Sequence, residues 1–153
     1  MARRSAGILP FRFSAGVLQV LLAHPGGPYW QRRDDGAWSI IKGEYSPEET
    51  ALAAARREFA EETGWSAAGE LLPLGELRQP GGKIVTAFGM RGDFDPATLG
   101  SNLFEIEWPP RSGLRASFAE IDRAAWFGLE AAGRKILPGQ APFLARLATV
   151  AAP

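Results

Sequence analysis

Residues 43–65 read GEYSPEETALAAARREFAEETGW, and this stretch decides how the rest of the chain is interpreted. Ser46 is a candidate N-cap, Pro47 suits the first helical position, and Glu49 completes the S-x-x-E pattern of a capping box. Gly64 tolerates the left-handed conformation that commonly follows a helix C-terminus. The sequence therefore predicts a helix that begins near Ser46 and ends just before Gly64.

Three glutamates, Glu58, Glu61 and Glu62, fall near the end of this predicted helix. Carboxylates there oppose the helix macrodipole, and Glu58 and Glu62 repel each other as like charges four residues apart. At about 100° per residue, the three acids lie within roughly 100° of one another, beside an apolar stripe that includes Leu52 and Phe59. A solvated acidic face is one interpretation. Because the acids disfavour the helix, the other is an oxygen site for a hard cation such as Mg²⁺.

The composition suits an ordinary globular protein organised as a single domain over residues 1–153, with 46% hydrophobic and 22% charged residues. Seventeen basic and seventeen acidic residues cancel, so there is no global electrostatic case for a nucleic acid polymer or an anionic membrane. No segment reaches the roughly 18 apolar residues of a membrane span. We expect a cytoplasmic protein.

The absence of cysteine excludes a disulfide scaffold, thiolate metal sites and a cysteine nucleophile. The one histidine, His24, makes a zinc site of the usual kind improbable, and its position before Pro-Gly-Gly-Pro predicts a loop residue. Any charge-driven chemistry must therefore come from local groups of oxygen and nitrogen side chains.

Short apolar runs and turn signals predict strands that flank the helix, followed by two C-terminal helices. The predicted strands are Ala6–Leu9, Gly16–Ala23, Trp38–Ile41, Leu71–Arg78, Lys83–Met90 and Phe104–Trp108, and the predicted helices are Leu129–Leu137 and Pro142–Val150. This order favours the α/β class, with a mixed sheet packed between helices.

The spacing of the opening stretch resembles the Nudix box. The match comprises Gly43, five residues, Glu49, seven residues, Arg57-Glu58-Phe59, one residue, Glu61-Glu62, one residue, and Gly64-Trp65. Two positions that are usually bulky and aliphatic carry the aromatic residues Phe59 and Trp65. The resemblance implies a Nudix-type α/β/α sandwich with a central mixed β-sheet. It also implies a hydrolase that cleaves a pyrophosphate bond in compounds linked to a nucleoside diphosphate, with Mg²⁺ or, in its place, Mn²⁺.

The resemblance also assigns metal ligands. Glu61 and Glu62 would be the principal ligands, and Glu58 would be a further ligand or the base that activates water. The backbone carbonyl of Lys42 would complete the metal shell. A bound cation lowers the pKa of coordinated water and neutralises phosphate charge, and a carboxylate can then accept the proton.

Other residues of the box would support this chemistry. By similarity, Arg57 would orient Glu58 and pair with Glu49, and Gly43 would let the backbone approach metal and phosphates closely. Many family members recruit one more glutamate from a downstream loop, and Glu120 resembles that residue. An ordinary surface acid is the alternative interpretation of Glu120.

Candidate substrate-binding residues lie outside the box. Arg32 and Arg33 follow Tyr29 and Trp30, and guanidinium groups suit phosphates as aromatic rings suit a base. Lys83, just after a Gly-Gly turn, could also reach a phosphate. A polar surface loop is the plainer interpretation of each residue taken alone.

Several alternatives stay open at this point. Dinucleoside polyphosphates or (d)NTPs are the favoured substrates, with ADP-ribose or nucleotide sugars as the alternative suggested by Pro80, fifteen residues past the box. Gly81 stands where one group of diadenosine polyphosphate hydrolases carries tyrosine. A non-catalytic Nudix-fold module that binds a nucleotide, and an unrelated fold with a structural acidic helix, are the competing classes. The partner would be a small nucleotide, and the protein a monomer or homodimer.

Overall fold

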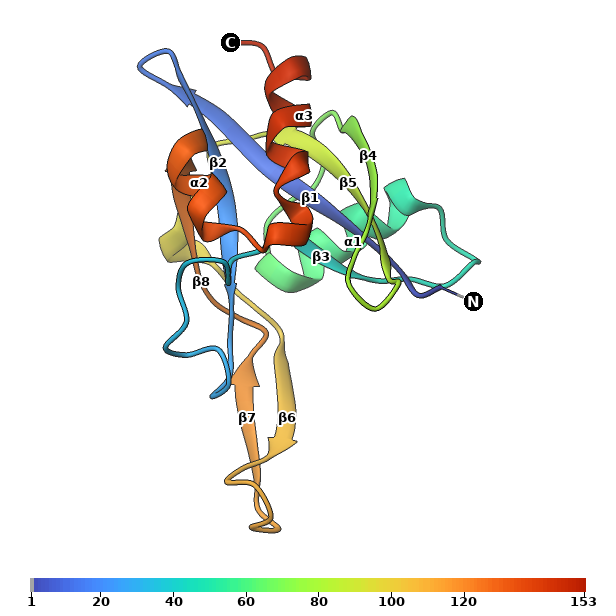
Figure 1. Ribbon diagram of the computed structural model, residues 1–153, viewed down its shortest axis with the longest axis vertical. Helices are drawn as coiled ribbons and strands as arrows, with labels where there is room; N and C mark the ends of the chain where they lie inside the picture. Colours follow the sequence, from blue (N-terminus) through green and yellow to red (C-terminus); the bar gives the residue numbers. More distant parts are fainter. Residues whose placement is uncertain (1) are drawn as a thin grey trace.

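The computed structural model describes residues 2–153, in which a twisted sheet is covered by helices on both faces (Figure 1). Within these residues, six strands form the sheet in the order β4-β5-β1-β2-β8, with β3 also paired to β1. The strands are β1 Arg4–Ser14, β2 Val17–Pro25, β3 Ile41–Glu44, β4 Leu72–Arg78, β5 Ile84–Arg91, β6 Leu103–Glu107, β7 Arg115–Ala119 and β8 Ile121–Gly128. The α-helices are α1 Ala51–Thr63, α2 Leu129–Lys135 and α3 Pro142–Val150.

The long strand β1 organises the sheet. It runs parallel to β5 and antiparallel to β2, which pairs with its second half, and to β3, which pairs with its first half. The register places Gly7 opposite Lys42 and Ala6 opposite Gly43. The sheet is therefore mixed, as predicted, and β3, which pairs with its central strand β1, carries the first residues of the box.

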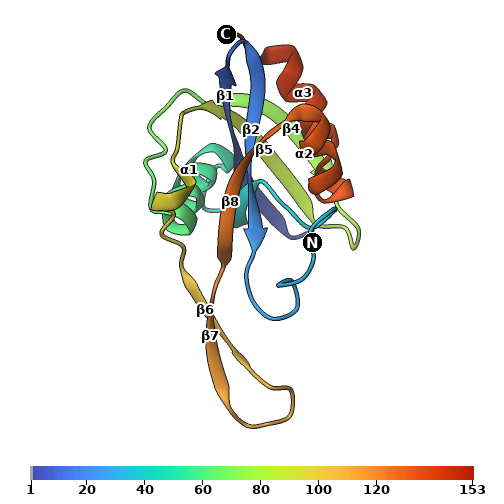
Figure 2. The ribbon, with the colours of Figure 1, turned by 90° about the vertical axis from the view of Figure 1, so that its left-hand side faces the viewer.

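Helix α1 covers one face of the sheet and helices α2 and α3 cover the other (Figure 2), and an apolar cluster fills the space on each side. In β2, Val20 and Leu22 join the cluster that includes residues of α2 and α3, whereas Leu21 and Ala23 join the cluster that includes residues of α1. A strand that buries both faces needs a continuous apolar run, which explains the sequence VLLA. The α/β/α sandwich predicted from the box is confirmed.

The start of helix α1 differs from the sequence prediction. Thr50 is the N-cap, and its hydroxyl oxygen accepts a hydrogen bond from the Ala53 amide at 3.1 Å. Ser46 instead closes a turn, since its carbonyl accepts from the Glu49 amide at 3.1 Å. The capping box does not form because the Glu49 side chain is held by Arg57, at 2.7 and 2.9 Å.

The predicted end of α1 is confirmed, but the predicted buried face of this helix is partly wrong. Gly64 has φ of 77° and donates to the Ala60 carbonyl, as predicted for a left-handed C-cap. Leu52, assigned to the apolar stripe, is 43% exposed, because the helix buries the side that contains Ala55, Glu58 and Phe59. One of the three clustered glutamates thus lies on the packed side of the helix.

Strands β6 and β7 form a hairpin that projects away from the sandwich (Figures 1 and 2). The predicted alternation of β6 is confirmed, with Phe104 opposite Phe118 on one face and Glu105 paired to Arg115 at 2.8 Å on the other. Strand β7 was not predicted from the sequence. Beyond the hairpin the chain turns at Glu120 into β8, which returns to the main sheet. No helix within residues 2–153 has the length and apolarity that crossing a bilayer requires.

Candidate active site

Arg57 ties the loop before α1 to the acids on the helix. Its Nε and Nη2 donate to the two oxygens of Glu49 at 2.9 and 2.7 Å, and its Nη1 donates to Glu58 at 2.8 Å and to Glu61 at 3.0 Å. The bidentate bond to Glu49, followed by the bond to Glu58, raises the pKa of Arg57, and the same contact lowers the pKa of Glu49. Such planar two-point recognition is specific to arginine.

Gly43 lies directly against the carboxylate of Glu58. A Cβ atom on Gly43 would stand 2.0 Å from Oε2 of Glu58, which no side-chain-bearing residue could tolerate without displacing the acid. Glu58 is only 8% exposed, and it is held from one side by Arg57 and from the other by this backbone contact. The chain therefore fixes the position of Glu58 before any ligand binds.

A cavity of about 200 Å³ opens beside these acids. It is lined by residues 39–42, Ala23, Pro25, Glu62, Glu120 and Ile121. Burial, followed by the charges of Glu120, Glu58 and Glu61, raises the pKa of Glu62 from its ordinary value of 4.5 to about 7. The structure thus brings Glu120, from the junction of β7 and β8, to the same cavity as a glutamate of the box.

The side chain of Lys42 belongs to this environment as well, although only its carbonyl was considered from the sequence. Desolvation lowers its pKa, repulsion from Lys83 adds to the effect, and the charges of Glu44, Glu58 and Glu62 oppose it. Lys42 follows Ile41 in a short strand pinned to β1, so its position is set by the sheet. A cation beside the clustered acids can contact an anionic substrate.

The backbone of Glu120 is held on both sides. Its amide donates to the Asn102 carbonyl at 2.8 Å, and its carbonyl accepts from the Gly26 amide at 2.9 Å. A Cβ atom on Gly26 would overlap the Ala119 carbonyl oxygen, at 1.8 Å, so glycine is required for this approach. Glu120 was predicted to lie on a loop, and these backbone contacts fix the conformation of that loop.

His24 is not the loop residue that the sequence predicted, because it lies in β2 and is fully buried. Its Nδ1 lies 2.8 Å from Oδ1 of Asp122, and its Nε2 lies 2.7 Å from the carbonyl oxygen of Arg33. Both partners are acceptors, so a ring nitrogen that bonds either of them does so as the donor. His24 thereby joins the loop after β2 to the beginning of β8. The Pro-Gly-Gly-Pro run that follows it gave no signal of this role.

The predicted substrate-binding residues lie outside the cavity. Arg32 and Arg33 are exposed in the loop after β2, and the Arg33 guanidinium lies 5.4 Å from the centre of the Trp30 ring. The Lys83 ammonium is 3.9 Å from Glu44 Oε2. Neither these arginines nor Lys83 is among the residues that line the carboxylate cavity.

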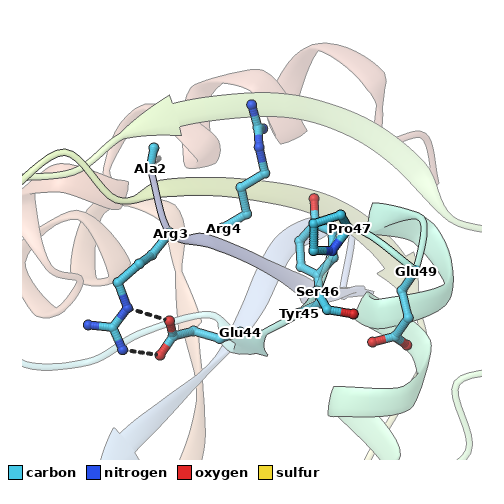
Figure 3. Close-up of a pocket in the computed structure, with 8 residues that line it drawn as sticks. All are labelled: Ala2, Arg3, Arg4, Glu44, Tyr45, Ser46, Pro47 and Glu49. Atoms are coloured by element: carbon cyan, nitrogen blue, oxygen red, sulfur yellow. Dashed lines mark hydrogen bonds and ion pairs between the residues drawn. The ribbon is translucent and has the colours of Figure 1, made fainter.

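A larger depression, of about 740 Å³, adjoins the first residues of the box (Figure 3). Arg3 and Glu44, joined by two hydrogen bonds at 2.7 and 2.8 Å, form part of its wall together with Arg4 and Tyr45. It contains none of Glu58, Glu61 and Glu62. The larger depression is therefore separate from the smaller cavity, which Glu62 and Glu120 line.

The acids fit a divalent cation by their chemistry. Within residues 2–153, no three histidine, aspartate or glutamate side chains converge as a ready-made cation shell, since Glu58 and Glu61 both bond Arg57. The donors are nevertheless oxygens, which hard cations prefer, and a cation would offset the burial and the neighbouring negative charges that raise the pKa of Glu62.

Comparison with known proteins identifies the family and the fold. A family model described as the NUDIX domain matches residues 1–147. A search of curated proteins found no match. An Ap4A hydrolase of C. elegans, solved as a binary complex, superposes with a TM-score of 0.67 at 20% identity, over 95% of this chain and 96% of that one.

Two further solved structures share the architecture. The NUDIX domain of Shewanella oneidensis NrtR, complexed with ADP ribose, gives a TM-score of 0.65 at 14% identity, over 97% of this chain and 88% of that one. The E. coli ORF135 protein gives a TM-score of 0.58 at 20% identity, over 97% of this chain and 91% of that one. At these identities the similarity shows the fold and does not assign a substrate.

The chain belongs to the Nudix domain family, as the match over residues 1–147 shows. Membership in this family, together with the box, supports a pyrophosphohydrolase, and the family generally uses divalent metal ions. The class of protein predicted from residues 43–65, a Nudix pyrophosphohydrolase, is therefore confirmed.

Proposed function

We propose that this protein is a metal-dependent pyrophosphohydrolase acting on dinucleoside polyphosphates or nucleoside triphosphates, with Mg²⁺ that Mn²⁺ can replace. The observation that carries the proposal is the grouping of acids at one cavity, which is lined both by Glu62 of the box and by Glu120 of a distant strand junction, and where burial and then the charge of Glu120 raise the pKa of Glu62. A module that only binds nucleotides would not need this set of acids. We further propose one cytoplasmic domain over residues 1–153, monomeric or homodimeric.

Glu61 and Glu62 are the proposed principal metal ligands, with Glu58 and the carbonyl of Lys42 as further ligands. The bound cation would neutralise phosphate charge and lower the pKa of the attacking water. The chain itself supplies the oxygens, and among the three glutamates it shields Glu58, which is 8% exposed, from bulk water. The Lys42 side chain adds a positive charge where phosphate oxygens would lie.

Glu58 and Glu120 are the two candidates for the general base. Glu58 is held rigidly by Arg57 and by the contact with Gly43, so it suits a fixed proton acceptor or ligand. Glu120 is exposed, and its backbone is clamped at both ends, so it suits a group that meets the substrate from the cavity edge. Arg57 positions Glu58, through their hydrogen bond, for either role, as proton acceptor or as metal ligand. Glu49 and Gly64 keep the loop and the helix in place.

Lys83, Arg32 and Arg33 are proposed to bind substrate from outside the cavity. Lys83 lies beside Glu44, which is on the same strand as Lys42, and the Lys83 ammonium can contact phosphates. Arg32 and Arg33 lie on the loop that His24 joins to β8. They are exposed, so they can reach the outer part of a bound nucleotide.

The test is a hydrolysis panel with Mg²⁺ that includes diadenosine tetraphosphate, dATP, ADP-ribose and a nucleotide sugar. Products are identified by mass spectrometry after reaction in ¹⁸O-water, which shows the phosphorus that water attacks. Glu62→Gln and Glu58→Gln should each lower kcat by about 100-fold or more, and the surface variant Glu130→Gln should match wild type. Undiminished activity in Glu62→Gln or Glu58→Gln, or tight nucleotide binding without turnover across the panel, would refute the proposal.

A further inference from the structure

A basic depression of about 610 Å³ lies between the turn that joins β4 to β5 and the N-terminal end of the chain. Its walls are Ala2, Arg3 and residues 78–83. Three of these residues, Arg3, Arg78 and Lys83, are cationic, and none is acidic. The depression is therefore a concave surface with three positive charges, outside the cavity that contains the glutamates.

The acids nearby do not balance this charge. Glu44 makes a bidentate pair with Arg3, at 2.7 and 2.8 Å (Figure 3), and lies 3.9 Å from Lys83, so one carboxylate serves two cations. The Arg78 guanidinium donates to the Gly82 carbonyl at 3.2 Å, and no carboxylate within residues 2–153 pairs with it. An anion in the depression would supply the missing negative charge.

The floor of the depression is open to a ligand. Gly81 and Gly82 both have positive φ, of 88° and 90°, and form the turn itself. A Cβ atom on Gly81 would meet no atom within 4 Å, and one on Gly82 would find Arg78 Nη1 as its nearest neighbour, at 3.8 Å. Phosphate oxygens can therefore approach the turn without displacing any side chain.

Strand β3 connects this depression to the reactive cavity. Lys42 lines the cavity together with Glu62, and Glu44, two residues or about 7 Å further along the strand, contacts both Arg3 and Lys83. Lys42 and Lys83 are close enough to repel each other, so cationic side chains continue from the cavity to the depression, with the acid Glu44 among them. A single diphosphate held at the cavity would not extend over this distance, whereas a longer chain of linked phosphates would.

We propose that Arg3, Arg78 and Lys83 form a subsite for the distal phosphates of the substrate, so that the enzyme selects a condensed chain of three or more phosphates over a simple diphosphate. Guanidinium groups suit this role because they bind phosphate oxygens in pairs. This inference rests on the proposed function, since it names the part of the substrate that extends beyond the reactive cavity.

The first test measures binding without catalysis. Inorganic tripolyphosphate is titrated into metal-free protein in EDTA and low salt by isothermal calorimetry, with pyrophosphate as the shorter probe. Arg78→Gln should weaken tripolyphosphate binding about tenfold, as expected for one lost charge-assisted contact. Arg134→Gln removes the same charge from an exposed position on α2 and should leave binding unchanged. Because Arg78 is exposed, both variants should unfold at the wild-type temperature.

The second test compares kcat/KM for diadenosine tetraphosphate with kcat/KM for ADP-ribose. In Arg78→Gln this ratio should fall about tenfold, mainly through a higher KM, because the contact is to phosphates that do not react. Tripolyphosphate binding equal in wild type and Arg78→Gln would overturn the subsite, whatever the hydrolysis panel shows. Weakened binding in a protein that hydrolyses nothing would support the subsite and refute the proposed function, so the two failures are distinct.

Discussion

Replacing Glu62 by glutamine should stabilise the metal-free protein at alkaline pH, although it removes a proposed metal ligand. Burial and the neighbouring acids raise the pKa of Glu62 from 4.5 to about 7. A group with a raised pKa in the folded state contributes stability below its unfolded value, and that contribution is lost as the pH rises through the folded value. Above pH 7 the wild-type protein therefore carries an unfavourable charge that Glu62→Gln lacks.

The size of the effect follows from the same shift. A rise from 4.5 to about 7 corresponds to at most about 3 kcal/mol, at ~1.36 kcal/mol per pH unit. Glu62 is only half-buried, and solvent screens its interaction with exposed Glu120, so about 1–2 kcal/mol is the expected difference. At pH 5, where the wild-type side chain is largely protonated, the two proteins should differ by a few tenths of a kcal/mol.

The assay is urea unfolding in EDTA at pH 5 and pH 8.5, followed by intrinsic tryptophan fluorescence. Glu130→Gln, which changes an exposed acid on α2, serves as the control and should match wild type at both pH values. Addition of 10 mM Mg²⁺ at pH 8.5 should stabilise wild type by ligand linkage and should stabilise Glu62→Gln less. Loss of stability in metal-free Glu62→Gln at pH 8.5 would refute the reasoning about crowded acids. Failure of Mg²⁺ to stabilise wild type would refute the metal assignment.

Three other substitutions test the geometry around the cavity. Gly43→Ala places a methyl group against Glu58 and should lower kcat/KM by about 100-fold, measured by steady-state hydrolysis; near-normal activity would contradict the close contact. Arg57→Lys keeps the charge but loses the two-point bond to Glu49, so kcat should fall about tenfold, and an unchanged kcat would show that the pair does not position the acids. His24→Leu leaves two acceptors without donors and should cost about 2–4 kcal/mol in urea unfolding, whereas a loss below about 1 kcal/mol would show that the buried bonds contribute little.

The sequence predicted the class of fold and the identity of the acids because both depend on local patterns. The box specifies residue types at fixed spacing, and the left-handed Gly64 depends only on its own backbone. The predicted cap at Ser46 was wrong because Glu49, counted as its partner, is bound by Arg57 from a later turn of the helix. Local rules for capping could not include a competing side chain eight residues away.

The arrangement around the cavity could not be predicted in the same way. Glu120 reaches Glu62 because β8 pairs with β2, a contact between segments about a hundred residues apart. His24 was hidden by the turn residues that follow it, and its partners Asp122 and Arg33 have no fixed spacing from it. Strand β7 is short and half-exposed, so its five residues give only a weak alternation.

The projecting hairpin offers a place to attach a reporter close to the reaction. Its tip, between β6 and β7, lies far from the sandwich in the ribbon views, whereas its last residue, Ala119, directly precedes Glu120 (Figures 1 and 2). A fluorophore or short peptide inserted between Ser112 and Gly113 would disturb only the bonds of the tip. An insertion of one residue beside Ala119 would instead shift the register of Glu120. A label carried at Arg115, the first residue of β7, would be separated from Glu120 by one five-residue strand, or roughly 17 Å.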